Sequence, residues 1–543
     1  MKSTAVKKYS IVDLFAGAGG LSYGFLQTGR FDVKAAFENN LNAQKTYKLN
    51  HGEADVYDDV ADALTESTKQ KLGKVDIVVG GPPCQGFSNA NRQKNHAVSQ
   101  NNSLVKKFVQ AVLHLNPTAF VMENVSMLKS NIHQFYVDES DGAVIAEFGI
   151  KTIASTIPIL DEEHWFDGAD VFVSDPQSIA KHLWAESDYL ILNVVFKNRR
   201  NEKKLTARLR MHQQRLMEIA RGLSANAGDD HISVQERHAG EAIQGYFNND
   251  QTFATAEYLC SIIEPSIMIQ RMLSKAKEIH DNRIAVSGYA IEHGLVAKVR
   301  SMAVIDYVEA ILGGSGYALT DGILSAASFG APQKRMRFVV IGVKREHAPS
   351  GVTLPIGQLT EETYNSVKDA IGDIEDIETT HEVTTGDAGF QLPDLPAQIS
   401  DLGRALRDSP ILYNHVSTTT TPEALERFKA IPQGSNFHSL DPAMKTSYSE
   451  PTRTQNTIYL RLRYDEPSGT VINVRKSMWI HPMKDRALSV REAARLQTFP
   501  DSFVFCGTKD SQYQQVGNAV PPILAKAIAE HICRYLDDEE SNE

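Results

Sequence analysis

Short apolar runs alternate with segments of helical length along the first 125 residues, and an open α/β sheet accommodates such a pattern. The runs at 9–15, 32–37, 75–79 and 120–122 are rich in β-branched and other apolar residues and predict strands. A further short strand is expected to close at 58–60. Strands that alternate with helices pair in parallel. The sequence therefore predicts a doubly wound parallel sheet, with ligands bound at the carboxyl ends of its strands.

A glycine-rich turn with the sequence A-G-A-G-G follows the first strand at 16–20, and a helix is expected from about Leu21 to Gln27. This arrangement brings a ligand close to backbone N–H groups at a helix N-terminus. The second strand ends at Glu38, about twenty residues beyond the glycines, where a carboxylate suits ribose hydroxyls. The combination indicates a nucleotide-like ligand, which a nicotinamide-dependent dehydrogenase would also bind.

The strand at 75–79 leads into the sequence G-G-P-P at 80–83, and Cys84 follows. Proline has a fixed φ angle, which restricts the backbone just before this thiol. A thiol at the carboxyl edge of a sheet is placed to act as a nucleophile, although a free cysteine is often an inert apolar side chain. Glu123 follows the strand at 120–122 and is expected at the same edge.

Composition restricts the ligands and the compartment. The 543 residues carry 56 Lys and Arg against 67 Asp and Glu, a net charge of −11, which disfavours a general polyanion binder. Contact with nucleic acid would need local positive charge, which 198–215 and 453–486 could supply, although solvated surfaces look similar. Four widely spaced cysteines favour a reducing compartment. Without a signal peptide, a long apolar run or an HExxH or CxxC motif, we expect a soluble, metal-free cytoplasmic monomer.

Six motifs, in the family's usual order, resemble the cytosine-C5 methyltransferases of bacterial and phage restriction-modification type, which use S-adenosylmethionine. They are D-L-F-A-G-A-G-G-L-S-Y-G-F (13–25), G-P-P-C-Q-G-F-S (81–88), E-N-V (123–125), P-Q-K-R-M-R-F (332–338), R-E-A-A-R-L-Q-T-F-P-D-S-F (491–503) and Q-V-G-N-A-V-P-P (515–522). A dehydrogenase needs none of the later five. The resemblance implies methyl transfer to C5 of a cytosine in a specific double-stranded DNA sequence, with the base flipped out of the helix.

The resemblance also implies roles for individual residues. Cys84 would add to C6 of the cytosine, Glu123 would assist at N3, and Arg337 with Arg335 would hold O2. S-adenosylmethionine, which becomes S-adenosyl-L-homocysteine, would contact residues of the first two strands, the nucleophile loop and the last motif. This expected set comprises Phe15, Ala16, Gly17, Gly19, Gly20, Leu21, Glu38, Asn39, Asp59, Val60, Pro83, Asn518 and Val520.

The spacing of the motifs implies a large insertion between the acid motif and the arginine motif. The expected parts are a cofactor and nucleophile part (1–130), an inserted subdomain (131–300), an arginine-motif part (301–345), a target-recognition domain (346–485) and a C-terminal part with an acidic tail (486–543). The insertion contains a strand-like run at 189–196. It is followed by an amphipathic helix with a basic outer face, in which Leu205, Leu209, Leu216, Ile219 and Leu223 have helical spacing. This element would contact DNA or a partner, or would be a helical decoration without such contacts.

The target-recognition domain is expected to begin with a poorly packed acidic connection at 360–396. Its later arginine and aromatic residues, including Tyr459, Tyr464 and Trp479, could reach base edges and phosphates. Two alternatives to DNA methylation remain: an RNA cytosine-5 methyltransferase and a non-catalytic DNA-binding regulator of the same fold. A partner of a restriction endonuclease, an orphan methylase and a phage-borne copy would all look alike at this level.

Overall fold

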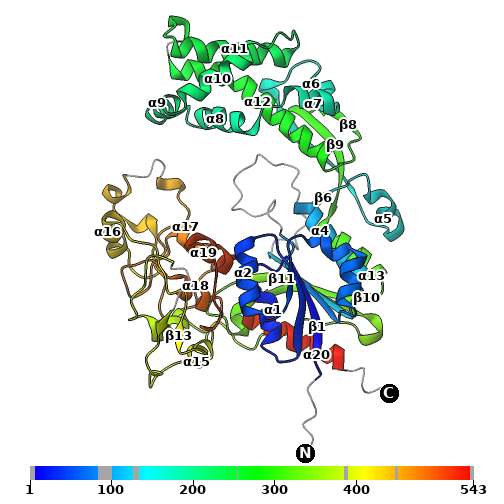
Figure 1. The fold of residues 1–543 in the computed structure, drawn as a ribbon, viewed down its shortest axis with the longest axis vertical. Helices are drawn as coiled ribbons and strands as arrows, with labels where there is room; N and C mark the ends of the chain where they lie inside the picture. Colours follow the sequence, from blue (N-terminus) through cyan, green and yellow to red (C-terminus); the bar gives the residue numbers. More distant parts are fainter. Residues whose placement is uncertain are drawn as a thin grey trace, which may run out of the picture. The chain divides into compact units, whose positions relative to one another are not determined.

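The computed structural model describes residues 7–83, 101–125, 134–253, 255–383, 389–446 and 451–537. The chain forms two compact units (Figure 1). The first comprises 1–84, 103–130 and 308–543, and the second comprises 85–102 and 131–307. The predicted nucleophile Cys84 lies outside the described residues.

A seven-stranded sheet with the order β10-β11-β5-β4-β1-β2-β3 forms the centre of the first unit. Its strands are β1 (Tyr9–Leu14), β2 (Phe31–Phe37), β3 (Asp55–Tyr57), β4 (Ile77–Gly80), β5 (Ala119–Val125), β10 (Tyr317–Ser325) and β11 (Met336–Lys344). Strands β1 to β5 pair in parallel as predicted, whereas β11 pairs antiparallel with both β5 and β10. The doubly wound fold is therefore confirmed, and the sheet is mixed at this end, where the connection at 326–335 between β10 and β11 is too short for a crossover.

Helices cover both faces of this sheet. Alternate side chains of a strand point to opposite faces, so Ile11 and Ile77 pack with Phe25 of α1 (Gly20–Leu26) and Ile528 of α20 (Pro522–Asp537). The C-terminal helix thus returns to the N-terminal strands, as predicted. On the other face, Phe120 meets Phe108 of α4 (Asn101–Leu115), with ring centroids 6.3 Å apart. Further helices of this region are α2 (Leu41–Asn50), α3 (Glu66–Leu72) and α13 (Val304–Gly314).

The target-recognition region has a core of its own, which continues into the last motifs. Its elements are α14 (Val367–Ile371), β12 (Phe390–Gln391), α15 (Asp401–Leu406), β13 (Ile411–Leu412), α16 (Pro422–Ala430), α17 (Val474–Ser477), α18 (Val490–Leu496) and α19 (Lys509–Asn518). The predicted loose connection is wrong at 367–374, where Val367 and Ile374 are fully buried. Tyr459 and Trp479, which were predicted to reach base edges and phosphates, are also buried. Their aromatic rings pack into hydrophobic cores.

The second unit combines a small antiparallel sheet with a helical bundle. Its strands are β6 (Gln134–Tyr136), β7 (Ile153–Asp161), β8 (Gly288–Ile291) and β9 (Gly294–Ala303), and each of the other three pairs with β9. Its helices are α5 (Asp141–Phe148), α6 (Ala169–Ser174), α7 (Pro176–His182), α8 (Glu186–Lys197), α9 (Glu202–Met211), α10 (Gln213–Ser224), α11 (His231–Phe247) and α12 (Ala256–Asp281). Within the described ranges, no helix of the chain is long and apolar enough to cross a membrane.

Two predictions for this unit need correction. The run at 189–196 is helical and lies within α8, where Leu192, Val195 and Phe196 are buried while Leu190 is exposed. A short apolar run does not distinguish a strand from a half-buried helix, so the prediction failed. The amphipathic helix predicted beyond it is two helices, α9 and α10, which meet at His212. The five leucine and isoleucine side chains that predicted it are all buried.

Candidate active site

The glycine turn lies between β1 and α1 and forms an open backbone cradle. Gly17 has a φ of 57°, and its N–H donates to Oε2 of Glu38 over 2.8 Å. Oε1 of Glu38 accepts from the N–H of Asn40, also over 2.8 Å. No atom of the neighbouring described residues lies within 4 Å of the place where a Cβ on Gly17 would stand. The carboxylate at the end of β2 and the open turn therefore lie together, an arrangement that fits S-adenosylmethionine.

A buried polar network supports the turn from below. A Cβ on Gly19 would stand 2.1 Å from Cε1 of His51, so glycine is required at this left-handed position. Oγ of Ser22 lies 3.1 Å from Nε2 of His51 and 2.9 Å from the hydroxyl of Tyr47, which donates to Asp13 over 3.2 Å. Burial raises the pKa of Asp13 to about 7 and lowers the pKa of His51 to about 4.

Sequence reasoning missed this network. An acid within an otherwise apolar strand, Asp13, was the available signal. The partners Tyr47 and His51 lie on and just beyond α2, a helix that carried no motif. Their function here is to hold the glycine turn, since the ring of His51 occupies the space beside Gly19.

The other residues predicted to bind the cofactor differ in their exposure and in the residues that they contact. A Cβ on Gly20 would stand 2.4 Å from the carbonyl oxygen of Val520, so the final motif packs directly on the turn. Asp59 caps the 3-10 helix Val60–Leu64, accepts from the N–H of Ala61 over 2.8 Å, and is largely exposed. Among the remaining residues, Leu21 and Val60 are buried, Phe15, Ala16 and Pro83 are half-buried, and Asn39 and Asn518 are exposed.

The predicted acid and one predicted arginine form a buried ion pair. Oε1 of Glu123, on β5, lies 2.6 Å from Nε of Arg337, on β11, and both side chains are nearly buried. A Cβ on Gly81 would stand 3.0 Å from Oε2 of Glu123, so the acid borders the loop that leads to Cys84. The side-chain amide of Asn124 donates to the carbonyl of Pro82 over 2.8 Å and fixes that loop's start. Burial raises the pKa of Glu123, and the guanidinium of Arg337 opposes this shift.

Arg335 is positioned differently. Its guanidinium donates to the carbonyl of Val471 over 2.8 Å and to that of Gly517 over 3.1 Å, and the side chain is 1% exposed. It therefore joins the arginine motif to the target-recognition region and to α19. Its predicted contact with the substrate stays a prediction.

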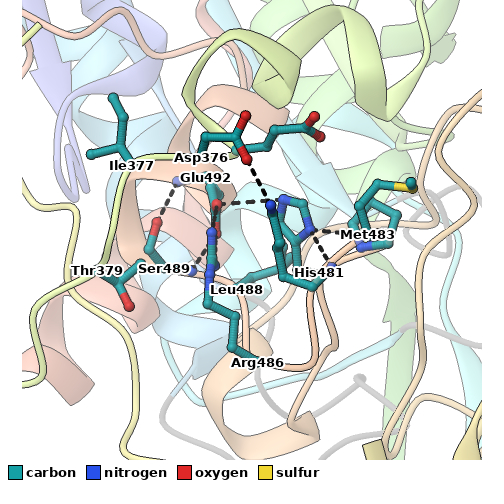
Figure 2. A network of polar contacts seen from close by, with 12 residues as sticks. Asp376, Ile377, Thr379, His481, Met483, Arg486, Leu488, Ser489 and Glu492 are labelled. Atoms are coloured by element: carbon teal, nitrogen blue, oxygen red, sulfur yellow. Dashed lines mark hydrogen bonds and ion pairs between the residues drawn. The ribbon is translucent and has the colours of Figure 1, made fainter. Parts of the chain in front are cut away.

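A second buried carboxylate lies near the start of α18 (Figure 2). Both terminal nitrogens of the Arg486 guanidinium donate to the carboxylate of Glu492, over 2.8 and 2.6 Å. The backbone N–H of Ser489 donates to the same carboxylate over 2.7 Å. Nε2 of His481 lies 3.6 Å from the same carboxylate, and burial lowers the pKa of this histidine to about 4. Sequence reasoning placed Glu492 in a motif without assigning it this function. Across the described ranges, no group of three or more His, Cys, Asp or Glu residues is arranged to hold a metal ion.

The mixed sheet and the glycine turn with its acid define a Rossmann-like methyltransferase that uses S-adenosylmethionine. A crystal structure whose title assigns it only provisionally as a DNA modification methyltransferase encoded within an E. coli prophage shares this fold. It superposes with a TM-score of 0.55 and 18% sequence identity, covering 98% of this chain and 100% of the other.

Sequence comparison narrows the class. A family model for C-5 cytosine-specific DNA methylases matches residues 9–140 and 295–534, more than half of the chain, so the protein belongs to this family and is a DNA (cytosine-5-)-methyltransferase. The type II methyltransferase M.AgeI of Thalassovita gelatinovora is 27% identical, over 96% of this chain and 98% of that protein. M.DdeI of Desulfomicrobium norvegicum is 25% identical, over 97% and 89%. The family model leaves most of the second unit, residues 141–294, unmatched.

Proposed function

We propose that this enzyme methylates C5 of a cytosine flipped out of a specific double-stranded DNA sequence, through a covalent bond between Cys84 and C6. The ion pair of Glu123 with Arg337, 2.6 Å between Oε1 and Nε, is the observation that carries the proposal. It borders Gly81, at the end of the strand that leads to Cys84. Burial raises the pKa of this carboxyl, so it binds a proton more readily, and beside a guanidinium it suits a ring that gains electron density at N3 and O2.

In this mechanism the thiolate of Cys84 adds to C6, and Glu123 gives its proton to N3 as the ring becomes an enamine. Arg337 donates hydrogen bonds to O2 and offsets the charge that develops there. When bound, S-adenosylmethionine would supply an electrophilic methyl group on its sulfonium sulfur for C5 of the enamine and would leave as S-adenosyl-L-homocysteine. Loss of the C5 proton to water then re-forms the C5–C6 double bond and expels the thiolate of Cys84, while N3 returns its proton to Glu123.

The cradle around Gly17 would hold the cofactor. Its open backbone would accommodate the methionine part, and Glu38, which accepts from the N–H of Gly17, would also accept hydrogen bonds from the ribose hydroxyls. Asp59, whose carboxylate is largely exposed, is available to the adenine amine. Val520, packed on Gly20, would close the pocket from the end of the chain.

The curated relatives suggest a biological setting. M.AgeI and M.DdeI are named type II methyltransferases, so we propose that this chain modifies the recognition site of a restriction-modification system. A cognate restriction endonuclease that cuts the unmodified site would then be its partner in the cell.

Base-resolution methylation sequencing tests the proposal. The chain and its Cys84→Ala variant would each be expressed in a host that lacks cytosine methylation. Methylcytosine confined to one short sequence context, and absent with the variant, supports both the reaction and the nucleophile. Methylcytosine made equally by the Cys84→Ala variant would refute the covalent mechanism, and none in either sample would refute methylation of DNA.

A further inference from the structure

Four basic side chains lie on α9 and just before it in the second unit. Arg200 precedes the helix, while Lys203, Lys204 and Arg208 lie on it, and a spacing of four residues places Arg208 beside Lys204. All four are exposed. Leu205 and Leu209, each 1% exposed, hold the opposite face of the helix in the core of the unit. These four residues are called the α9 stripe.

The α9 stripe is not neutralised within the protein. Among the described residues, none of its four side chains has a carboxylate within 4.0 Å, and Arg208 contacts only the sulfur of Met211 at 3.5 Å. In contrast, Arg215 on α10 pairs with Asp188 at 2.6 Å and with Glu218 at 2.9 Å. Like charges on neighbouring positions of a helix destabilise it, so an anion bound against the stripe would reduce the repulsion between these side chains.

We propose that the α9 stripe binds the phosphate backbone of the DNA that this enzyme methylates, which rests on the proposed function. Flexible Lys and Arg side chains on one exposed face suit phosphates, because such contacts need charge without a fixed geometry at each base. From Lys203 to Arg208 the helix rises about 7.5 Å, which spans about two phosphate intervals along one strand. The stripe would therefore add affinity and orientation, while sequence would be read elsewhere.

The chemistry of the surface favours DNA over a protein partner. A stable protein interface has an apolar centre rich in aromatic residues. Here Met211, 66% exposed, is the large apolar side chain of α9 that accompanies the four cations of the stripe. The stripe also lies in the part of the chain that the family model leaves unmatched, so it adds a contact to those that the family's shared core supplies.

The test compares two fourfold variants of the full-length enzyme. The stripe variant is R200A/K203A/K204A/R208A. The control, K181A/R215A/K277A/K298A, removes the same charge from the same unit at positions that each face a carboxylate. Both are assayed for thermal melting, for methyl transfer, and for affinity to a duplex that holds the methylated site, between about 50 and 200 mM salt.

We expect the stripe variant to melt like wild type and to bind DNA at least about tenfold more weakly at low salt. The slope of log affinity against log salt should become less negative by about 0.9 for each phosphate that the variant no longer neutralises, while the control keeps the wild-type slope. If the stripe variant kept the wild-type salt dependence, the proposal would be overturned, and an acidic protein surface would be the alternative ligand of the stripe. Equal losses in both variants would overturn it too, because net charge would then explain them. A wild-type protein that neither binds nor methylates DNA would overturn the proposed function as well.

Discussion

Within the described part of the first unit, two glutamate–arginine pairs have buried carboxylates, and these carboxylates have very different surroundings. Glu492 receives two hydrogen bonds from Arg486 and a third from the N–H of Ser489, at 2.6 to 2.8 Å (Figure 2). Glu123 has a contact of 2.6 Å from Nε of Arg337, and its Oε2 faces the backbone of Gly81. Both carboxylates are buried, so burial alone does not separate them.

Among the residues that the structure describes, the two sites differ in how many donors face each carboxylate. Burial opposes ionisation in both, but Arg486 outweighs it at Glu492 and holds the pKa of that carboxyl far below its usual range. At Glu123 burial outweighs Arg337, so the pKa is raised. A carboxylate whose lone pairs are filled by the protein can only stabilise the fold, whereas one with lone pairs to spare can exchange a proton with a ligand. The comparison assigns Glu492 to structure and Glu123 to chemistry.

The sharpest test of this division is Glu123→Gln. The amide has the same shape but no acidic proton, so we expect methyl transfer to slow by about 10² to 10⁴. Thermal stability should fall less than in Glu492→Gln, because burial already disfavours the charged form of Glu123, although Arg337 loses its charged partner. Single-turnover rates at saturating DNA and S-adenosylmethionine, with melting curves of the same samples, measure both. A normal rate with a large loss of stability would reverse the assignment.

Glu492→Gln should behave in the opposite way. It leaves the guanidinium of Arg486 buried with a neutral partner, and breaking such a pair costs about 3–5 kcal/mol of unfolding free energy. Urea unfolding measures this loss, and methyl transfer per folded molecule should stay within a few-fold of wild type. The matched control is Glu492→Gln with Arg486→Met, which removes both charges and should recover part of the stability. Additive losses in the double variant would contradict a direct coupling.

The motif-bearing half of the molecule could be predicted from its sequence because local patterns and long-range structure agree there. The predicted strand at 9–15 and the helix at 21–27 lie within a residue or two of β1 and α1, where the glycine turn dictates the change of direction. The predicted pair of an acid and an arginine also meets in space, Glu123 with Arg337. The order of the motifs does not reveal the antiparallel pairing of β11, because β11 pairs with β5, a strand about 200 residues earlier in the chain, and no local pattern specifies that pairing.

Predictions failed where burial rather than local pattern decides the structure. The run at 189–196 forms a helix because one side of it packs into the core of the second unit, which its apolar composition does not reveal. The segment at 367–374 has an acidic, Thr- and Pro-rich setting, yet it is buried by partners far along the chain. The donors around Glu492, Arg486 and Ser489, both come from residues just before α18, and their convergence depends on the packing of that turn. Cys84 lies outside the described residues, so its position stays a prediction.

A smaller effect is expected from Ser489→Ala, which weakens the surroundings of Glu492 without removing its charge pair. Oγ of Ser489 accepts from the N–H of Glu492 over 3.0 Å as the cap of α18, and it lies 3.1 Å from Nδ1 of His415. Loss of a helix cap costs about 0.5–2 kcal/mol, so urea unfolding should show a decrease below that of Glu492→Gln. Ser489→Asp, which keeps a capping oxygen but adds a second carboxylate beside Glu492, should be worse than Ser489→Ala. If Ser489→Asp proved as stable as wild type, the site would be able to satisfy a second carboxylate. This would contradict the inference that the donors around Glu492 are fully used.

The smallest effect is a difference in the pH dependence of stability, and its sign separates the two carboxylates. The folded pKa of Glu492 lies below the unfolded value of 4.5, so its contribution is present above pH 4.5 and is lost as the pH falls. The folded pKa of Glu123 lies above 4.5, so its contribution to stability is fullest below pH 4.5 and is lost as the pH rises.

Melting temperatures of wild type and of each Gln variant, measured at intervals from acidic to neutral pH, should therefore diverge in opposite directions. The gap between wild type and Glu492→Gln should narrow on acidification, whereas Glu123→Gln should gain on wild type as the pH rises. His481, whose pKa is lowered to about 4, titrates beside Glu492, so a Glu492→Gln/His481→Asn variant serves as the control. Parallel curves for the two single variants would show that the donors around each carboxylate do not set its ionisation.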